Sequence, residues 1–289
     1  MVTRVAVVGA SGRLGSLACT LIEQQSDLTL VARLDSRSDL GEMLGADVVL
    51  DVTTPGVSPT VVDHAVRAGL KVLIGTSGWN EDRVRTLRTL LQAHPDAGVV
   101  VIPNFSLGSV LATHFATIAA RYFESIEIVE THHAAKVDSP SGTAVRTAEL
   151  IGRARAELGP VVAPHTDQRA RGQQVASVPI HSLRLQGAVA RQDVHFGGTG
   201  EVLTLTHETL SPSSYEAGIL LGLRAALETT GLVVGLDALI GLGTSVSGSD
   251  SGAAASARSA DEPAAAPARA AAPVPVPPAP SADFQGDTA

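Results

Sequence analysis

The sequence predicts an α/β protein that begins with a parallel sheet and continues with a mixed sheet. Short apolar runs alternate with amphipathic helical patterns from Arg4 to Ile102, which is typical of a parallel sheet with helices on both faces. After Phe105 the strand patterns become longer and follow one another, which indicates an α+β part. From Gly243 onward large apolar residues nearly vanish in favour of Ala, Ser, Gly and Pro, a composition that predicts disorder.

The bulk properties of the chain limit its class. Its 289 residues, 44% of them hydrophobic, suit one large or two modest globular domains. The net charge is −8, of which the segment after Leu242 contributes −3 and leaves −5. An acidic body with few aromatic residues argues against a nucleic-acid surface. No apolar run reaches the roughly 18 residues that span a membrane, no signal-peptide pattern opens the chain, and Cys19 is the only cysteine. We therefore expect a cytoplasmic protein without intramolecular disulfides.

A glycine-rich turn follows the first predicted strand, Arg4 to Val8. Gly9, Gly12 and Gly15 have the spacing G-x-x-G-x-x-G, and a helical pattern begins inside it. This context predicts a dinucleotide-binding turn, in which glycines let the backbone approach a pyrophosphate at a helix start. The spacing differs from the commonest G-x-G-x-x-G, and an ordinary glycine-rich β–α turn is the alternative.

The second predicted strand, Leu28 to Leu34, leads into Asp35. This carboxylate lies 20 residues after Gly15, where an acid can bind the 2′-hydroxyl of NAD. Arg37 lies two residues further on and can pair with the 2′-phosphate of NADP. A pair of solvated loop charges is the alternative.

Three more strands complete the predicted parallel sheet. They are expected at Asp47–Val52, Lys71–Ile74 and Gly98–Ile102, with helices that begin at Ser58-Pro59 and Asn80. Loops after the carboxyl ends of parallel strands line the ligand crevice of such a sheet. The predicted cofactor cleft therefore includes Gly9–Leu14, Asp35, Thr53–Pro55, Gly75–Ser77 and Ile102–Phe105.

The second half of the chain predicts a second domain with longer strands. The expected elements are a helix over Ser106–Phe123, a strand over Ser125–Thr131, a helix from Ser141 to near Gly159, strands over Ala176–Gln186, Ala188–Phe196 and Glu201–Thr209, and a helix from Ser211-Pro212 to near Gly231. The last helix is expected to return to the first domain. The predicted boundaries are residues 1–105 and 212–242 for the first domain, 106–211 for the second, and 243–289 for a disordered Ala/Pro-rich tail.

The stretch from Glu130 to Ala144, ETHHAAKVDSPSGTA, carries the densest chemistry. His132, His133 and Lys136 can hold positive charge or move protons. Ser141 is a good helix N-cap, and the free N–H groups of a helix start attract anions. Together they predict a pocket for a carboxylate-bearing or phosphorylated ligand. The alternative is a strand end followed by a plain helix cap.

A metal held by His132 and His133 is a competing hypothesis for this stretch. Neighbouring residues of a strand point to opposite faces, so one metal could not easily bind both. No cysteine or carboxylate cluster completes such a site. We therefore expect no metal.

These motifs resemble those of the 4-hydroxy-tetrahydrodipicolinate reductase (dihydrodipicolinate reductase) family. The matching segments are VAVVGASGRLG, the Asp51–Pro55 turn, GTSG, PNFSLG and ETHHAAKVDSPSGTA, and the resemblance runs from Val2 to Leu242. It implies a Rossmann-like dinucleotide-binding domain, a substrate-binding and oligomerisation domain with a mixed sheet, and a homotetramer formed through that sheet. It also implies reduction of 4-hydroxy-tetrahydrodipicolinate to tetrahydrodipicolinate by NADH or NADPH, with loss of water, in the diaminopimelate route to lysine.

The resemblance assigns roles to individual residues. His132 takes the place of the proton donor/acceptor, and Lys136 that of a second proton donor. The substrate-binding positions are His133, Gly142 and Thr143. The cofactor-binding positions are Gly9, Ala10, Ser11, Gly12, Arg13, Leu14, Asp35, Gly75, Thr76, Ser77, Ile102, Pro103, Asn104 and Phe105. The departures from the family pattern, at Val52, Ser77 and Ser139, remove no titrating group.

Two other classes of protein stay open. The chain could be a different nicotinamide dehydrogenase on the same cofactor domain, since fold does not set function. It could also be a non-catalytic NAD(P)-binding sensor. The presence of both His132 and Lys136 favours an enzyme over a sensor.

Overall fold

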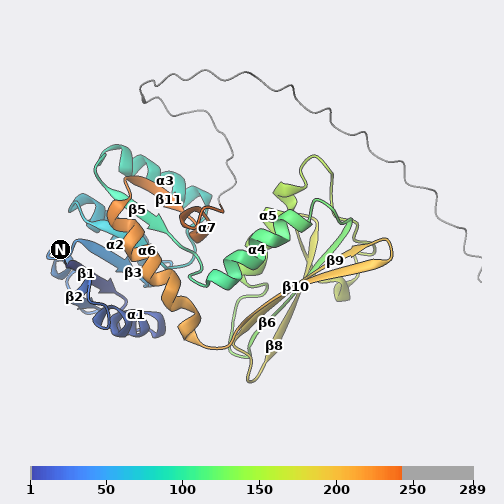
Figure 1. Cartoon of the computed structure of the whole chain (residues 1–289), viewed down its shortest axis with the longest axis horizontal. Coiled ribbons are helices and arrows are strands. Elements are labelled where there is room, and N and C mark those ends of the chain that lie inside the picture. The colour runs from blue at the N-terminus through green and yellow to red at the C-terminus, as the bar shows by residue number, and fades with distance from the viewer. Residues whose placement is uncertain (1, 243–289) are drawn as a thin grey trace, which may run out of the picture. The chain divides into compact units, whose positions relative to one another are not determined.

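The computed structural model describes residues 2–242, which contain two β-sheets (Figure 1). The tail predicted over 243–289 lies outside the described residues. Within the described part of the chain, no helix is both long and apolar enough to cross a membrane.

The first sheet has six strands, all parallel, in the order β11-β5-β4-β3-β1-β2. Its strands are β1 (Thr3–Val8), β2 (Leu28–Leu34), β3 (Val48–Asp51), β4 (Lys71–Ile74), β5 (Gly98–Val101) and β11 (Gly231–Val234). The parallel sheet predicted from the alternating pattern is confirmed. β11 is absent from the prediction, because Gly231 marks a helix end and the three apolar residues after it are too short a run to indicate a strand.

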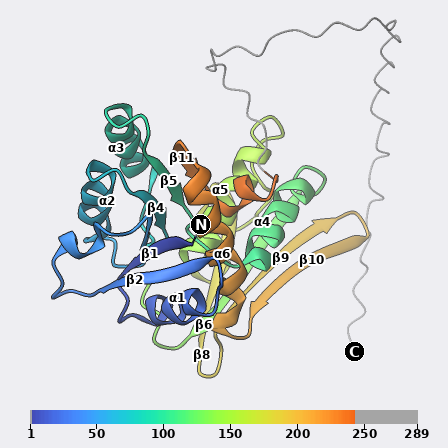
Figure 2. The same cartoon turned by 60° about the vertical axis from the view of Figure 1, so that its left-hand side comes forward.

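Helices cover both faces of the first sheet (Figures 1 and 2). They are α1 (Arg13–Glu23), α2 (Ser58–Arg67), α3 (Glu81–Gln92) and α6 (Glu216–Glu228). Successive side chains of a strand alternate between faces. Accordingly, Val5 and Val7 of β1 pack in one core with α1 and α6, whereas Ala6 and Val8 pack in the other with α2 and α3. Burial on both faces explains why these strands are continuous apolar runs.

The second sheet has five strands in the order β10-β9-β6-β8-β7. These are β6 (Ser125–His133), β7 (Gln173–Val175), β8 (Val178–Leu185), β9 (Ala190–Gly198) and β10 (Glu201–Thr209). β6 and β8 are parallel and the other pairs are antiparallel, so the mixed sheet is confirmed. Figure 2 shows β9 and β10 as a long hairpin.

Two helices, α4 (Leu107–Ala119) and α5 (Gly142–Ala154), pack on one face of the second sheet. Both end earlier than the sequence predicts. Arg155, directly after α5, is buried and donates hydrogen bonds to the carbonyls of Ala120 and Phe123, each at 2.5 Å. Arg155 therefore supplies donors to carbonyls beyond the end of α4. This tertiary contact is not encoded in the helix propensity of the residues in α4.

Short elements complete the described chain. They are 3₁₀ turns at Leu40–Met43, Arg169–Arg171 and Pro212–Tyr215, and α7 (Leu236–Leu239). The turn at Pro212 precedes α6, so the last long helix begins four residues later than the Ser-Pro signal predicts.

Candidate functional site

The glycine-rich turn between β1 and α1 has no room for a side chain at Gly9 or Gly15. Gly9 has φ +91°, and a Cβ on it would lie 2.6 Å from the carbonyl oxygen of Val52. A Cβ on Gly15 would lie 2.1 Å from the carbonyl oxygen of Gly9. Gly12 is the N-cap of α1 and has no side-chain cap, so the first N–H groups of the helix stay available to an anion. This turn fits the pyrophosphate of a dinucleotide.

Asp35 and Arg37 form a pair directly after β2. The Asp35 carboxylate accepts the Arg37 backbone N–H at 2.8 Å and its guanidinium at 3.1 Å. These contacts, the backbone hydrogen bond first, hold the pKa of Asp35 below its usual range. The Arg37 side chain is 88% exposed, so it can leave this pair without a packing cost. The pair stands at the second-strand end, as the sequence predicts.

The remaining cofactor loops meet at the same edge of the first sheet. A Cβ on Gly75 would lie 2.4 Å from the Phe105 ring and 3.1 Å from the Val52 side chain. Val52 also contacts Gly9, so the loops after β1, β3, β4 and β5 touch one another. Asn104 accepts the N–H of Ser106 at 2.9 Å and so connects the last loop to α4. The structure therefore brings together Gly9–Leu14, Gly75–Ser77 and Ile102–Phe105.

His132 lies on β6 beside a buried carboxylate and a partly buried guanidinium group. Its Nδ1 is 2.6 Å from Glu130, which is fully buried. Arg184 on β8 donates two hydrogen bonds to Glu130, each 2.9 Å long. Burial lowers the pKa of His132 below its usual value, while the Glu130 carboxylate acts to raise it and the Lys136 and Arg184 cations act to lower it. His132 is thus a partly buried imidazole whose charge depends on its neighbours.

Lys136 and His133 follow in the same stretch. The Lys136 ammonium pairs with Asp138 at 2.7 Å, and its backbone N–H donates to the carbonyl of His133 at 3.0 Å. His133 is the last residue of β6. Because side chains alternate along a strand, it starts on the opposite face from His132.

The start of α5 provides the second half of the predicted anion site. The Ser141 hydroxyl accepts the Ala144 N–H at 3.2 Å, and Ser141 is the N-cap that the sequence predicts. Gly142 is exposed, and a Cβ on it would meet no atom within 4 Å. Gly142 and Thr143 therefore begin a helix at an exposed position, and the N–H groups of a helix start suit a carboxylate.

Two residues of this site have no predicted role. Glu130 opens the key stretch, and its position two residues before His132 places both side chains on one face of a strand. That spacing is a signal which the sequence contains. Arg184 lies 54 residues after Glu130 in the sequence. Only the pairing of β6 with β8, in which His132 lies opposite Arg184, brings Arg184 to the site.

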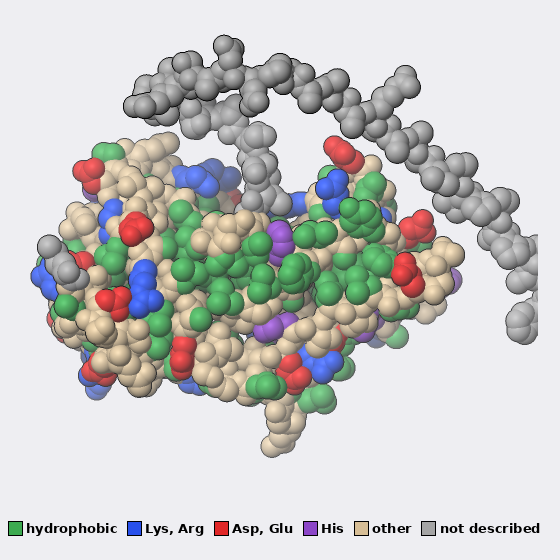
Figure 3. All heavy atoms as spheres, in the orientation of Figure 1, with side chains coloured by type: hydrophobic (Ala, Val, Ile, Leu, Met, Phe, Trp, Pro, Cys, Tyr) green, Lys and Arg blue, Asp and Glu red, His purple; other side chains and the backbone are tan. Residues whose placement is uncertain are grey.

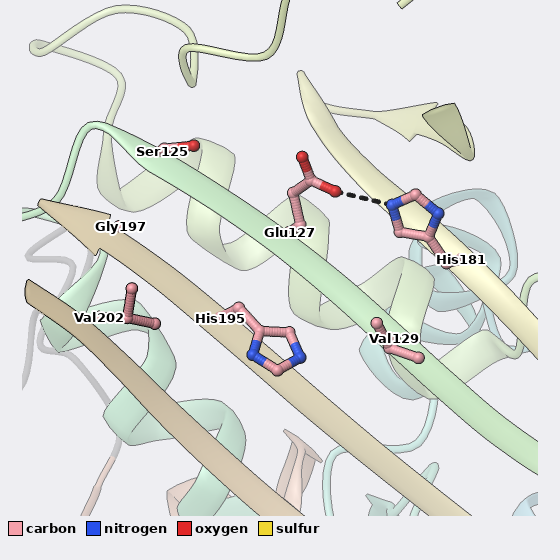
Figure 4. A pocket seen from close by; sticks show the side chains of 7 residues that line it. All are labelled: Ser125, Glu127, Val129, His181, His195, Gly197 and Val202. Atoms are coloured by element: carbon pink, nitrogen blue, oxygen red, sulfur yellow. Dashed lines mark hydrogen bonds and ion pairs between the residues drawn. The ribbon is translucent and has the colours of Figure 1, made fainter. Parts of the chain in front are cut away.

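A shallow hollow lies elsewhere, on the face of the second sheet that carries no helix (Figure 4). Glu127, Val129, His181 and His195 contribute to it, and Glu127 accepts a hydrogen bond from His181 at 2.8 Å. Glu127 and Glu130 lie three positions apart, so their side chains point to opposite faces. The hollow is therefore separate from the His132 site. Among residues 2–242, no three His, Cys, Asp or Glu side chains are grouped as a metal site.

Two family models match almost all of the described chain. The model described as "Dihydrodipicolinate reductase, N-terminus" matches residues 3–105, and the model described as "Dihydrodipicolinate reductase, C-terminus" matches residues 108–240.

Curated and solved proteins give the same result. The 4-hydroxy-tetrahydrodipicolinate reductase of Clavibacter michiganensis subsp. michiganensis is 62% identical over 242 residues, which cover 84% of this chain and 87% of the relative. That of Streptomyces griseus subsp. griseus is 48% identical over 246 residues, covering 83% and 98%. A solved dipicolinate-bound dihydrodipicolinate reductase from Paenisporosarcina sp. TG-14 is 31% identical, with a TM-score of 0.72 and coverage of 82% and 99%.

Proposed function

The chain belongs to the dihydrodipicolinate reductase family, and from this premise we propose which of its groups hold the cofactor and substrate and which move protons. It is a 4-hydroxy-tetrahydrodipicolinate reductase of the diaminopimelate route to lysine. The reaction forms tetrahydrodipicolinate with loss of water, and a nicotinamide dinucleotide supplies the hydride when bound.

The cofactor site is proposed at the carboxyl edge of the first sheet. The tight turn from Gly9 to Leu14 supports this, because its uncapped helix start can receive a pyrophosphate. Asp35 is proposed to accept hydrogen bonds from the ribose hydroxyls of NADH. Arg37 is proposed to turn from Asp35 to the 2′-phosphate of NADPH. We therefore propose that both cofactors are used, with NADH equal or modestly favoured.

The substrate site is proposed between β6 and the start of α5. The substrate carries two carboxylates, which need cationic partners and N–H donors. Lys136, His133 and the helix start at Gly142 and Thr143 are proposed to supply them. Lys136 is paired with Asp138 at 2.7 Å, so a substrate carboxylate would replace one carboxylate by another at the same ammonium group.

The proton that completes the reduction is proposed to come from His132. Hydride addition leaves electron density on the ring, and a positioned acid must protonate it. The observation that most supports His132 is its contact with buried Glu130 through Nδ1, which leaves Nε2 for exchange with a ligand. Lys136 is proposed as the second proton donor.

One assay tests these roles. The purified full chain is mixed with NADPH or NADH and freshly synthesised 4-hydroxy-tetrahydrodipicolinate, and loss of reduced-nicotinamide absorbance is followed. We expect turnover with both cofactors, and strongly reduced turnover in the His132→Ala variant. A His132→Ala variant with full turnover would refute the assignment of the acid. Cofactor binding without turnover in the wild type would indicate a sensor.

We also propose a homotetramer formed through the helix-free face of the second sheet. This face exposes Leu183, Leu185 and Val202, which are 45%, 51% and 73% accessible, and apolar side chains exposed together favour association. Figure 3 shows another apolar surface on the opposite side, over α4, where Phe115 is 50% exposed. The cytoplasmic location expected from the sequence stays a prediction.

Sedimentation of two matched variants distinguishes the two surfaces. Val202→Lys is expected to lower the oligomeric state, because it places charge in the proposed interface. Phe115→Lys is expected to leave it unchanged. The reverse result would move the interface to α4.

A further inference from the structure

The carboxylate of Glu130 is saturated by donors from the site. It is 0% exposed and accepts hydrogen bonds from His132 Nδ1 at 2.6 Å, the Ser141 N–H at 3.1 Å and two guanidinium N–H groups of Arg184 at 2.9 Å. A carboxylate offers about four acceptor positions. Glu130 therefore has none left for a substrate, and any effect on the reaction must pass through these neighbours.

Glu130 determines which nitrogen of His132 carries a proton. An ionised carboxylate only accepts hydrogen bonds, so Nδ1 must be the donor in this 2.6 Å contact. The opposite tautomer would place a nitrogen lone pair against a buried carboxylate oxygen, with neither group satisfied. The pKa of Glu130 is held low: burial acts to raise it, but the hydrogen bonds from Arg184 and His132 outweigh burial. Glu130 therefore stays ionised, and Nε2 is the nitrogen that exchanges protons.

The same carboxylate holds the anion-binding part of the site in place. It accepts the N–H of Ser141, the N-cap of α5. Arg184, held by Glu130, also donates to the carbonyl of Asp138 at 2.6 Å. The loop that carries Lys136 and Asp138 is thus held to Glu130 of β6 at two points. Arg184 connects Glu130 to Asp138, and Ser141 donates its N–H to Glu130 directly. One carboxylate sets where the imidazole, the ammonium and the helix start lie relative to one another.

We propose that Glu130 is a positioning residue for the reduction: it keeps His132 in the Nδ1–H tautomer with Nε2 directed to the substrate, and it keeps the start of α5 in register with that nitrogen. This inference rests on the proposed function of His132. Nε2 of the resting imidazole first takes up a proton from solvent. When the resulting imidazolium gives this Nε2 proton to the substrate ring, the neutral imidazole left behind is again the Nδ1–H form that Glu130 stabilises. Product formation and the resting hydrogen bond therefore favour the same tautomer.

The first test needs no variant of Glu130. The full chain is labelled with ¹⁵N-histidine, the imidazole ¹⁵N shifts are measured at neutral pH, and the His132 signals are assigned by their loss in His132→Asn. The expected result is a neutral ring protonated on Nδ1. A neutral ring protonated on Nε2 would overturn the proposal, whether or not variants of Glu130 fold.

The second test is the kinetics of Glu130→Gln. A glutamine keeps the volume but turns one acceptor atom into a donor. Each carboxylate oxygen accepts two of the four hydrogen bonds, so two contacts lose their acceptor, and Arg184 loses its counter-charge. Partners that orient metal-ligating histidines are typically worth about 10–100-fold, and we expect loss of this orienting carboxylate to lower kcat by a similar factor. We expect the substrate KM to rise, the NADPH KM to stay within about twofold, and both tautomers of His132 to appear. Glu130→Asp keeps the charge but is one methylene shorter, and we expect it not to restore kcat.

Glu127→Gln is the matched control. Glu127 lies on the same strand and also pairs with a histidine and an arginine, His181 and Arg171, but on the helix-free face. It is expected to leave the His132 tautomer and kcat close to wild type. A folded Glu130→Gln with wild-type kcat and a single His132 tautomer would overturn the inference while His132→Ala still loses activity. Full activity in His132→Ala would instead overturn the proposed function, and this inference with it.

Discussion

At the scale of single residues, the two glutamates of β6 have the same kinds of partner in different surroundings. Glu127 contacts His181 and Arg171 and is 27% exposed, whereas Glu130 contacts His132 and Arg184 and is 0% exposed. Burial acts to raise both pKa values, and hydrogen bonds from arginine and histidine lower them further than burial raises them. Breaking a buried pair leaves a charge without compensation, so only the Glu130 group is expected to be intolerant of change.

The proposed acids are testable by substitution. His132→Ala and Lys136→Ala are expected to lower kcat by about 10²–10⁴-fold, the usual contribution of one positioned acid. Neither residue touches the glycine-rich turn, so the NADPH KM is expected to stay nearly unchanged. Steady-state kinetics with each substrate varied checks this. Retention of full kcat by either variant would contradict its assignment.

The pair at the end of β2 makes a prediction about cofactor choice. Asp35→Ala is expected to weaken the binding of NADH more than that of NADPH. The substitution removes an acceptor for the ribose hydroxyls, and it also removes a carboxylate that repels the 2′-phosphate of NADPH. Arg37→Ala is expected to weaken NADPH more than NADH. Exposed charges are screened, so each effect should be about 1 kcal/mol, or several-fold in KM. If both variants shift the two KM values in parallel, neither side chain reads the 2′ position.

At the scale of elements, the face of β6 that packs under α4 and α5 changes character along its length. Ile126 and Ile128 are buried in the apolar core with Ala148 and Phe196. The next residues on that face are Glu130 and His132, which meet Arg184 and the start of α5. The first half of β6 therefore packs in the apolar core, and its second half holds the functional side chains. Packing of the first half keeps the strand rigid, as a precisely positioned site requires.

The β1–α1 turn gives a prediction at this scale. Gly15→Ala would place a Cβ 2.1 Å from the carbonyl oxygen of Gly9, so the backbone of the turn must move. Forcing a methyl group into packed structure costs about 1–3 kcal/mol, and a displaced turn should raise the cofactor KM more than the substrate KM. Gly45→Ala is the control, because a Cβ there meets no atom within 4 Å. Thermal unfolding and the two KM values check the result. Equal effects of both variants would contradict the role of the turn.

At the scale of the whole molecule, burial of two histidines links stability to pH. Burial lowers the pKa of His132 and of His207, so the folded state disfavours their charged forms. As pH falls below the unfolded value of about 6.5, the unfolded chain takes up these protons first. The free energy of unfolding is therefore expected to decrease as the pH is lowered from about 6.5 towards the lower pKa values that the two histidines have in the folded state.

The His207→Asn variant tests this linkage. His207 on β10 contacts Ser106, the N-cap of α4, at 3.1 Å, so its loss also changes the stability at neutral pH. The slope against pH is the informative quantity, and one proton contributes at most about 1.4 kcal/mol per pH unit. Denaturant unfolding is measured between about pH 5 and 7, the range in which histidines titrate. The unfolding free energy of the variant is expected to change less steeply with pH than that of the wild type. An unchanged slope would show that His207 does not contribute.

The sequence by itself determined the parts of this protein that depend on local pattern. Alternating apolar runs and helix caps predict the parallel sheet, and Asn80 and Ser141 cap helices as expected. The glycines of the first turn predict its tight geometry. The motif from Glu130 to Ala144 predicts the family, which the comparisons confirm. Each of these signals lies within about fifteen residues, where backbone sterics and side-chain period act directly.

The tertiary structure alone decided the features that join distant segments. β11 becomes a strand because β5 offers an unpaired edge, and the site acquires Arg184 because β8 lies beside β6. The buried Glu130 carboxylate obtains its charge partner from 54 residues away. A buried charge is tolerated only where the fold delivers a counter-charge and donors to it, and a single sequence does not specify which distant residue the fold will deliver.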